Sequence, residues 1–184
     1  SNEYLYFDTR TIRGANSTVS YVDLNGGLYG SHLYANEARA SKPYTYWPDL
    51  NGNFVVNNIN SDNSETEADY GWVYFTLSAP AYYGKSDVYI AGMFNNYALT
   101  PENKMDYNAK TGQYEKAIMV KQGITNYEYI LADKNGVIDN KNAIDGNFWQ
   151  TENNYQILVY YKENNQRYDR IIGRGTASST DITN

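Results

Sequence analysis

The sequence predicts an all-β protein built as an antiparallel β-sandwich. Tyrosine is unusually abundant, with 21 Tyr among 184 residues, and aromatic residues make up 16% of the chain. Aromatic and β-branched residues suit a half-buried pleated surface, while Asn and Gly supply the tight turns between short strands. No i, i+3, i+4 pattern of apolar residues continues for more than about two turns, which disfavours a helical fold.

The remaining composition narrows the class of function. The chain carries 15 Lys+Arg against 21 Asp+Glu, a net charge of −6, and this balance argues against a nucleic-acid partner because phosphate binding needs clustered basic residues. No apolar run approaches the roughly 20 residues of a membrane-spanning helix, so we expect a protein that does not span the membrane. Cysteine is absent, which excludes disulfides and thiol chemistry and fits an exported bacterial protein.

The first 60 residues are expected to form β-hairpins that either extend the sandwich or belong to a neighbouring domain. Residues 3–7 form a strand-like start. Residues 17–24 and 28–35 are two β-rich runs that flank Asn25-Gly26-Gly27, a typical hairpin turn. A second turn is expected at 49–52.

The main sandwich is predicted over residues 66–174. Residues 57–67 are rich in Ser, Asn and Asp and mark the boundary before it. Within 69–79, alternation places Val73, Phe75 and Leu77 on one face of a strand. The predicted strands are 69–79, 87–94, 113–121, 126–133 and 155–162. Residues 175–184 are expected to be a flexible tail.

Three Asp-x-Asn-Gly segments recur, at 23–26, 49–52 and 133–136. Carboxylate and amide oxygens at alternate positions also begin calcium-binding loops, but the acidic residue that closes such a loop is missing from the first two. In the third segment, Asp139 lies too close for EF-hand spacing. The segments are therefore predicted to be turns, in which Asp bonds the backbone and Asn-Gly adopts positive φ.

Catalytic patterns are weak. His32 is the only histidine, and it lies in a Tyr-rich strand without a diagnostic nucleophile or orienting partner, which favours a structural role. Paired carboxylates can hydrolyse a glycoside, but the sequence places no two acids at the required separation. No phosphate-binding glycine loop or zinc-type spacing occurs. We therefore predict a protein that is not an enzyme and needs no cofactor or metal.

The tryptophans offer an alternative basis for function, as a stacking platform for sugar rings. Trp47, Trp72 and Trp149 are the three candidates. Trp72 lies in the middle of an alternating strand, where packing is the favoured role. Trp149 lies near a predicted turn, and we expect it to be exposed. A glycan-binding function for a surface or periplasmic protein therefore stays open.

Within residues 88–129, a strand ends in Gly92-Met93-Phe94-Asn95-Asn96-Tyr97 and is followed by a turn and further strands. This order resembles the early-set immunoglobulin-like modules that include glycogen-binding carbohydrate-binding modules. In those modules a sugar-stacking Trp stands where this chain has Tyr97. The resemblance implies an immunoglobulin-like (early-set) sandwich and makes Tyr97 a candidate glycan contact.

A second set of sequence blocks runs in order along nearly the whole chain. The blocks are residues 2–10, 43–44, 49–52, 67–70, 73–77, 121–123, 126–129, 144–148, 151–155, 159–161 and 167–173. They resemble the family first catalogued as a domain of unknown function and later named the type IX secretion system plug protein. Members of that family are considerably longer, so the resemblance implies a C-terminal portion preceded by an amino-terminal domain.

This second resemblance implies a non-enzymatic accessory of type IX protein secretion. Such a protein is periplasmic, associates with the outer membrane and seals the translocon barrel when no substrate passes. Export would require a signal peptide upstream of Ser1. The expected partner is the outer-membrane translocon protein, with an oligosaccharide as the alternative.

The candidate contact residues for either partner lie mainly toward the end of the chain. Trp149, Glu152 and Asn153 combine an aromatic ring with acid and amide groups in a predicted loop, and aromatic residues are common in interface cores. In 167–170, strand alternation would put Arg167 and Asp169 on one face, where ion pairing within the sheet is favoured over partner binding. The candidates are Tyr97, Trp149, Glu152, Asn153, Arg167 and Asp169.

Overall fold

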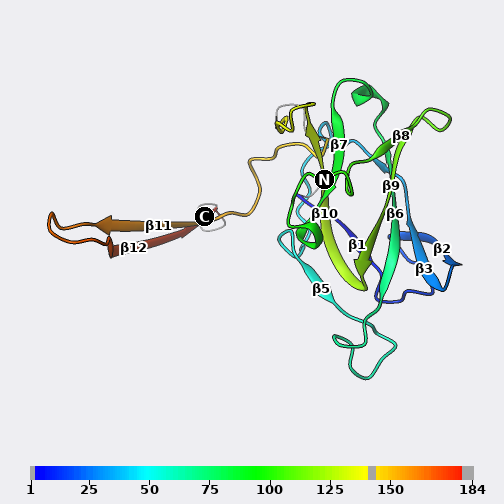
Figure 1. Ribbon diagram of the computed structural model, residues 1–184, viewed down its shortest axis with the longest axis horizontal. Coiled ribbons are helices and arrows are strands. Elements are labelled where there is room, and N and C mark those ends of the chain that lie inside the picture. Colours follow the sequence, from blue (N-terminus) through cyan, green and yellow to red (C-terminus); the bar gives the residue numbers. More distant parts are fainter. Residues whose placement is uncertain (1–2, 141–143, 180–184) are drawn as a thin grey trace. The chain divides into compact units, whose positions relative to one another are not determined.

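The computed structural model describes residues 3–140 and 144–179, which form an all-β protein (Figure 1). The chain divides into two units, Ser1–Asn147 and Phe148–Asn184. We call them the sandwich unit and the hairpin unit and describe each by itself. In the described part of the chain, no helix has the length and apolar character needed to cross a membrane.

The sandwich unit contains ten strands and two short 3₁₀ turns in its described residues. They are β1 (Leu5–Asp8), β2 (Val19–Asn25), β3 (Leu28–Leu33), β4 (Asn36–Glu37), β5 (Phe54–Val56), β6 (Tyr70–Ser78), η1 (Pro80–Tyr82), β7 (Asp87–Ala91), η2 (Met93–Asn95), β8 (Asp106–Asn108), β9 (Gln113–Lys121) and β10 (Gly123–Ala132).

These strands form two sheets, which are joined where β9 leads directly into β10 (Figure 1). One sheet has the order β2-β3-β6-β9-β8, with β4 also paired to β6; the other has β10 between β1 and β5, with β7 also paired to β10. Pairing is antiparallel except that β3 and β4 both run parallel to β6. Long connections between these parallel strands are required, because a short hairpin cannot join them.

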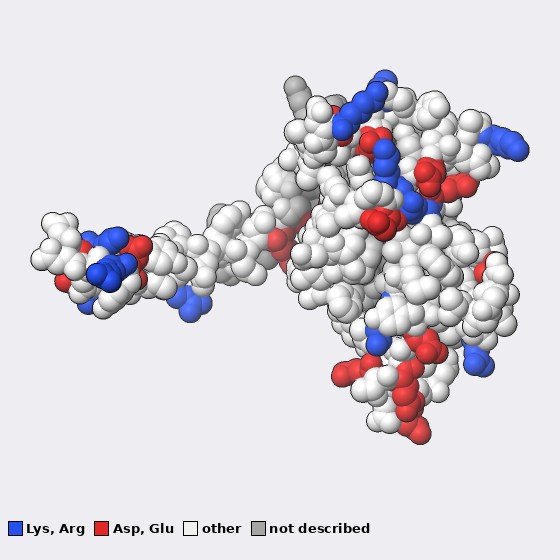
Figure 2. Space-filling view, in the orientation of Figure 1, with Lys and Arg blue, Asp and Glu red and all other residues white. Residues whose placement is uncertain are grey.

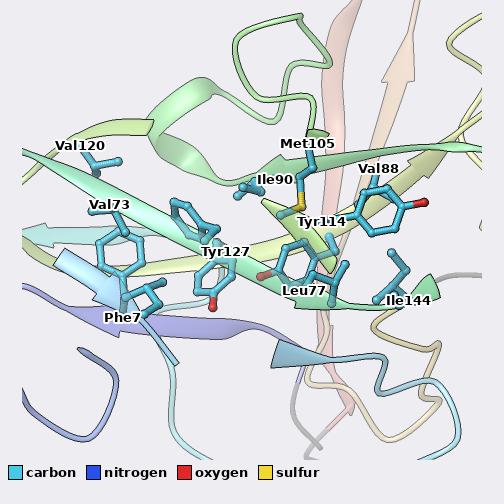
Figure 3. Packing of buried hydrophobic residues seen from close by; sticks show 14 of the residues in the cluster. Phe7, Val73, Leu77, Val88, Ile90, Met105, Tyr114, Val120, Tyr127 and Ile144 are labelled. Carbon is cyan, nitrogen blue, oxygen red and sulfur yellow. The ribbon is translucent and has the colours of Figure 1, made fainter. Parts of the chain in front are cut away.

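The core lies between the two sheets. Figure 3 shows Phe7, Val73 and Tyr127 packed together near one end of the buried cluster, with Met105 and Ile144 toward the other. The rings of Phe7, Phe75 and Tyr127 meet edge to face or tilted, with centroids 5.1 to 5.9 Å apart. Such aromatic contacts add to the free energy that burial of apolar area already contributes.

Several predicted elements are confirmed. The β2–β3 hairpin turns at Gly26 and Gly27, both with positive φ. In β6 the buried side chains are Val73, Phe75 and Leu77, as the alternation predicts. The all-β class is therefore established, whereas the immunoglobulin-like type stays a prediction.

The observed division of the chain differs from the predicted one at the C-terminal end of the sandwich. Strands β1 to β5, from the first 60 residues, pair within the same sheets as β6 and β10, so of the two predicted alternatives this segment extends the sandwich. The sandwich unit ends at Asn147 rather than at 174. Residues 175–178, expected in a flexible tail, are the end of a strand; 180–184 lie outside the described residues.

A buried ion pair connects two segments that lie outside the sheets with each other and with β10. The Arg39 Nε donates to Asp145 Oδ1 at 2.9 Å, and both side chains are about nine-tenths buried. The other Asp145 oxygen accepts from the Tyr129 backbone N–H at 2.7 Å. The Arg39 backbone N–H donates to Ile144 O. This pair thus joins the segment after β4, the segment after β10 and β10 itself.

We expect the Asp145→Ala substitution to destabilise the protein by at least about 3 kcal/mol, because it leaves the Arg39 guanidinium buried without its carboxylate. The matched control is Glu37→Ala, which removes an exposed ion pair with Lys42 and should cost less than about 1 kcal/mol. Urea unfolding measures both. Equal effects of the two substitutions would contradict the assigned role of the buried pair.

A second carboxylate near this pair responds to pH. Burial, and then the Asp145 charge, raise the pKa of Glu128 in β10 to about 6 from 4.5. The native state therefore binds more protons than the unfolded state between these two pH values. Stability consequently falls as pH rises through this window and is level above it.

We expect Glu128→Gln to remove this fall and to stabilise the protein at pH 7 by about 1 kcal/mol, a value reduced for partial solvent screening. Free energies of unfolding at pH 4.5, 5.5 and 7 for both proteins test this expectation. An unchanged pH slope in the variant would assign the effect to other groups.

Candidate functional site

Five of the six candidate contact residues lie in the hairpin unit. This unit contains β11 (Asn154–Tyr161) and β12 (Arg170–Ser178), which pair antiparallel with each other (Figure 1). Among its described residues, neither strand pairs with any other strand. In the part of the chain that the structure describes, the outer edges of β11 and β12 are therefore not paired with a further strand.

One face of the hairpin is apolar over residues 155–159 of β11. The β11 side chains on it are Tyr155, Ile157 and Val159, and they lie opposite Ala177, Gly175 and Gly173 of β12. Gly173 and Gly175 have no side chains, so no side chain projects from β12 at these two positions. A Cβ added there would contact Val159 or Ile157. This apolar face, defined by Tyr155, Ile157 and Val159, is exposed, with Ile157 at 65% of its full area.

The opposite face is mixed. Leu158 and Tyr160 of β11 and Ile171 of β12 are exposed there as well. With its amide oxygen toward β12, Gln156 accepts from both Arg174 Nη2 and Nε at 3.1 Å. Polar pairing therefore occupies one half of this face, and apolar side chains occupy the other.

Short polar contacts define the two ends of the hairpin. At its base, Asn153 donates through its side-chain amide to Thr151 O, and its backbone N–H donates to Ser179 Oγ at 2.8 Å. At the far end, Arg170 Nη2 lies 2.6 Å from Glu163 Oε1. Asn153 is thus a structural residue of the strand entry, and Glu152 beside it is exposed.

The placement of Arg167 and Asp169 on one strand face is wrong. Both residues lie in the connection between β11 and β12, and β12 begins only at Arg170. The ion pair of this region is formed by Arg170 rather than by Arg167 or Asp169. Arg167 and Asp169 are thus part of a polar loop.

Trp149 is exposed, as expected from its position near a turn, with 87% of its area free. Trp47 of the sandwich unit is also exposed, while Trp72 is half-buried in β6. Figure 2 shows that the charged side chains of the hairpin unit gather in part of its visible surface and leave much of it uncharged.

No described residue of the hairpin unit belongs to the buried core cluster. An isolated two-stranded hairpin is marginally stable in water, because it buries too little apolar area to offset the entropy of ordering its backbone. By itself, the hairpin therefore buries little apolar area.

The sixth candidate, Tyr97, has a structural contact instead of a free ring. Its hydroxyl donates to Gly52 O at 2.6 Å, and it lies at the end of a turn in which Asn96 and Tyr97 both have positive φ. Burial, and then the nearby Tyr4, raise the pKa of Tyr97. Tyr97 thus connects the segment after η2 to the turn at 49–52. The Asn126 side-chain oxygen stabilises that turn by accepting hydrogen bonds from two of its backbone N–H groups.

His32 is a packing residue of the sheet. Its ring is stacked between Tyr21 and Tyr74, with centroids 4.0 and 4.1 Å away, and Nε2 lies 3.2 Å from Asp23 Oδ2. The Asp-x-Asn-Gly segments at 49–52 and 133–136 are turns, in which Asp49 and Asp133 accept from backbone N–H groups. In the described ranges, no three acidic or histidine side chains are grouped to hold a metal.

Comparison with known proteins identifies a structural relative without a described function. No family model matches the chain, and no curated protein matches it. A crystal structure of a hypothetical protein from Parabacteroides merdae ATCC 43184 is similar, with 34% identity and a TM-score of 0.81. The match covers 96% of this chain and 44% of that one. The chain therefore spans less than half the length of this relative.

We expect amide hydrogens of β11 to exchange at least about a hundredfold faster than those of β10 in the isolated chain, because hairpin opening costs little free energy compared with opening of the core. Hydrogen exchange followed by NMR measures this difference strand by strand. Equal protection of the two strands would show that the hairpin is stable without a covering surface.

Proposed function

We propose that the chain is a non-enzymatic protein-docking module, in which the hairpin unit attaches the sandwich unit to a β-sheet of a partner protein. The observation that carries the proposal is the hairpin of β11 and β12, with an apolar face, two free edges and no core of its own. Addition of a strand at a free edge supplies backbone hydrogen bonds, and alternate side chains supply specificity.

The size of the hairpin favours a larger partner over a second copy of the chain. Each strand extends over eight or nine residues. One face of such a pair covers roughly 300 Å², whereas a stable interface needs about 800 Å² from each partner. Two apolar hairpin faces stacked on each other therefore fall short. A partner sheet that pairs with an edge and also covers the apolar face supplies the missing area.

The identity of the partner rests on the sequence blocks described above. They resemble the type IX secretion plug family, and the proposed partner is accordingly the outer-membrane translocon protein. The proposed location is the periplasm. A rigid sandwich attached in this way acts mechanically, by occupying space at the barrel opening, and needs no catalytic residue.

Glycan binding at the position of Tyr97 is the less favoured function. The Tyr97 hydroxyl is engaged with Gly52, and the side chain of Tyr4 lies against the same glycine position. A sugar stacked on Tyr97 would compete with these contacts. Trp149 is 87% exposed, but one exposed ring offers no platform unless further polar groups converge on it.

The proposed docking is tested by affinity capture with the tagged chain from detergent-solubilised envelopes. We expect the wild-type protein to capture a large outer-membrane β-barrel, identified by mass spectrometry, and Ile157→Asp to capture at least about tenfold less because a charge enters the apolar interface. The control is Ile59→Asp, at a similarly exposed isoleucine of the sandwich unit.

Three results would contradict the proposal. Equal capture by Ile157→Asp and wild type would remove the hairpin from the interface. A dimer that light scattering detects for the wild type and not for Ile157→Asp would assign the apolar face to a second copy. Capture of no barrel protein at all would remove the translocon as partner.

A further inference from the structure

The sandwich unit also contains a cavity. The residues that line it are distant in the sequence from the hairpin. The volume of the cavity is about 340 Å³, and it lies among residues 83–88, 104–107, Tyr114 and Lys134. The residues that line the cavity come mainly from the η1–β7 connection, from the start of β8 and from β9. A volume of this size suits one or two sugar rings.

One of the residues that line the cavity has a buried polar atom without a partner. Tyr114 in β9 is 4% exposed, and its hydroxyl has no hydrogen-bond partner among the described residues. In Figure 3 the Tyr114 hydroxyl lies on the far side of its ring from Ile90 and Tyr127. Burial raises the pKa of Tyr114, so the phenol is protonated at neutral pH and can donate. A buried hydroxyl left unpaired costs free energy that a ligand oxygen would recover.

The charges around the cavity favour an anion. Among the charged lining residues, Lys104 pairs with Asp87 at 2.7 Å, and Asp106 lies 3.6 Å from Lys116. Lys85 and Lys134 also line the cavity and have no ion-pair partner among the described residues. Figure 2 shows basic and acidic groups intermingled at the end of the unit that carries β7 and β8. Two free ammonium groups are available to a carboxylate in a protein of net charge −6.

The aromatic wall and the acids favour a ligand with a ring and hydroxyl groups. Tyr83 stacks on Tyr107 with ring centroids 4.0 Å apart, and Tyr83 is 60% exposed. Its outer face is therefore free for the apolar C–H face of a sugar ring. The Asp87 and Asp106 carboxylates can accept hydrogen bonds from ligand hydroxyls, which a simple inorganic anion does not possess.

We propose that this cavity binds an acidic saccharide of one or two rings. The Tyr83 ring packs on the sugar face, Lys85 and Lys134 bind its carboxylate, and a small shift of the Tyr83–Tyr107 pair brings Tyr114 Oη into hydrogen-bond contact with a ring substituent. This site shares no residue with the hairpin and does not depend on the docking function.

The test is a calorimetric or NMR titration of the full chain with sodium glucuronate, glucose and inorganic phosphate. We expect saturable binding of glucuronate, at least about tenfold tighter than either glucose or phosphate. Tyr114→Phe should weaken glucuronate binding about fivefold to tenfold while leaving the thermal midpoint unchanged or raised, because an unpaired buried hydroxyl has been removed.

Lys134→Met provides a second variant that does not alter the core, and Lys110→Met is the matched control, since Lys110 is an exposed lysine in the β8–β9 turn outside the cavity. We expect weaker glucuronate binding for Lys134→Met alone. The proposal is overturned by an absence of saturable glucuronate binding, by phosphate binding as tight as glucuronate binding, or by equal losses in Lys134→Met and Lys110→Met.

Discussion

The buried ion pair of Arg39 and Asp145 is the interaction on which the sandwich unit depends. It fixes two segments outside the sheets, and through the Tyr129 backbone N–H it fixes them to β10. Removing two charges from water is costly, and the pair is tolerated because its oxygens and backbone neighbours are hydrogen-bonded as well. Around it, Tyr127 and Tyr129 donate to the same Asn36 oxygen, so polar contacts continue from the pair into the core.

Strands whose side chains alternate cleanly could be predicted from the sequence. The limits of β9 agree with the predicted 113–121, and Gly26 and Gly27 mark the β2–β3 turn, because local alternation and turn chemistry decide these elements. The parallel pairing of β3 with β6 could not be predicted in this way. It depends on which strands meet in space, and local periodicity contains no information about that.

The candidate sites, too, could be predicted from the sequence only where local features decide them. Exposure of Trp149 follows from its place beside a turn, but Tyr97 is tied to Gly52 by a contact between segments 45 residues apart. Tyr114 belongs to a predicted strand, yet its unpaired hydroxyl becomes visible only when the loop at 83–87 is placed beside β9. The exposure of the apolar hairpin face could not be predicted from the sequence either, because an apolar strand is normally assigned to a buried core.

The pairing of β1 with β10 has a consequence for the way the chain folds. The Asn126 amide reaches Leu5 O across 121 residues, and Thr9 bonds Gly123 across 114. Contacts of this length require the closure of a large loop before they contribute any free energy, which makes folding slow. On a ribosome, the first strand is synthesised long before its partner and stays unpaired until β10 emerges. The sandwich is therefore completed late, and its earliest strand is the segment that most needs protection from aggregation during synthesis.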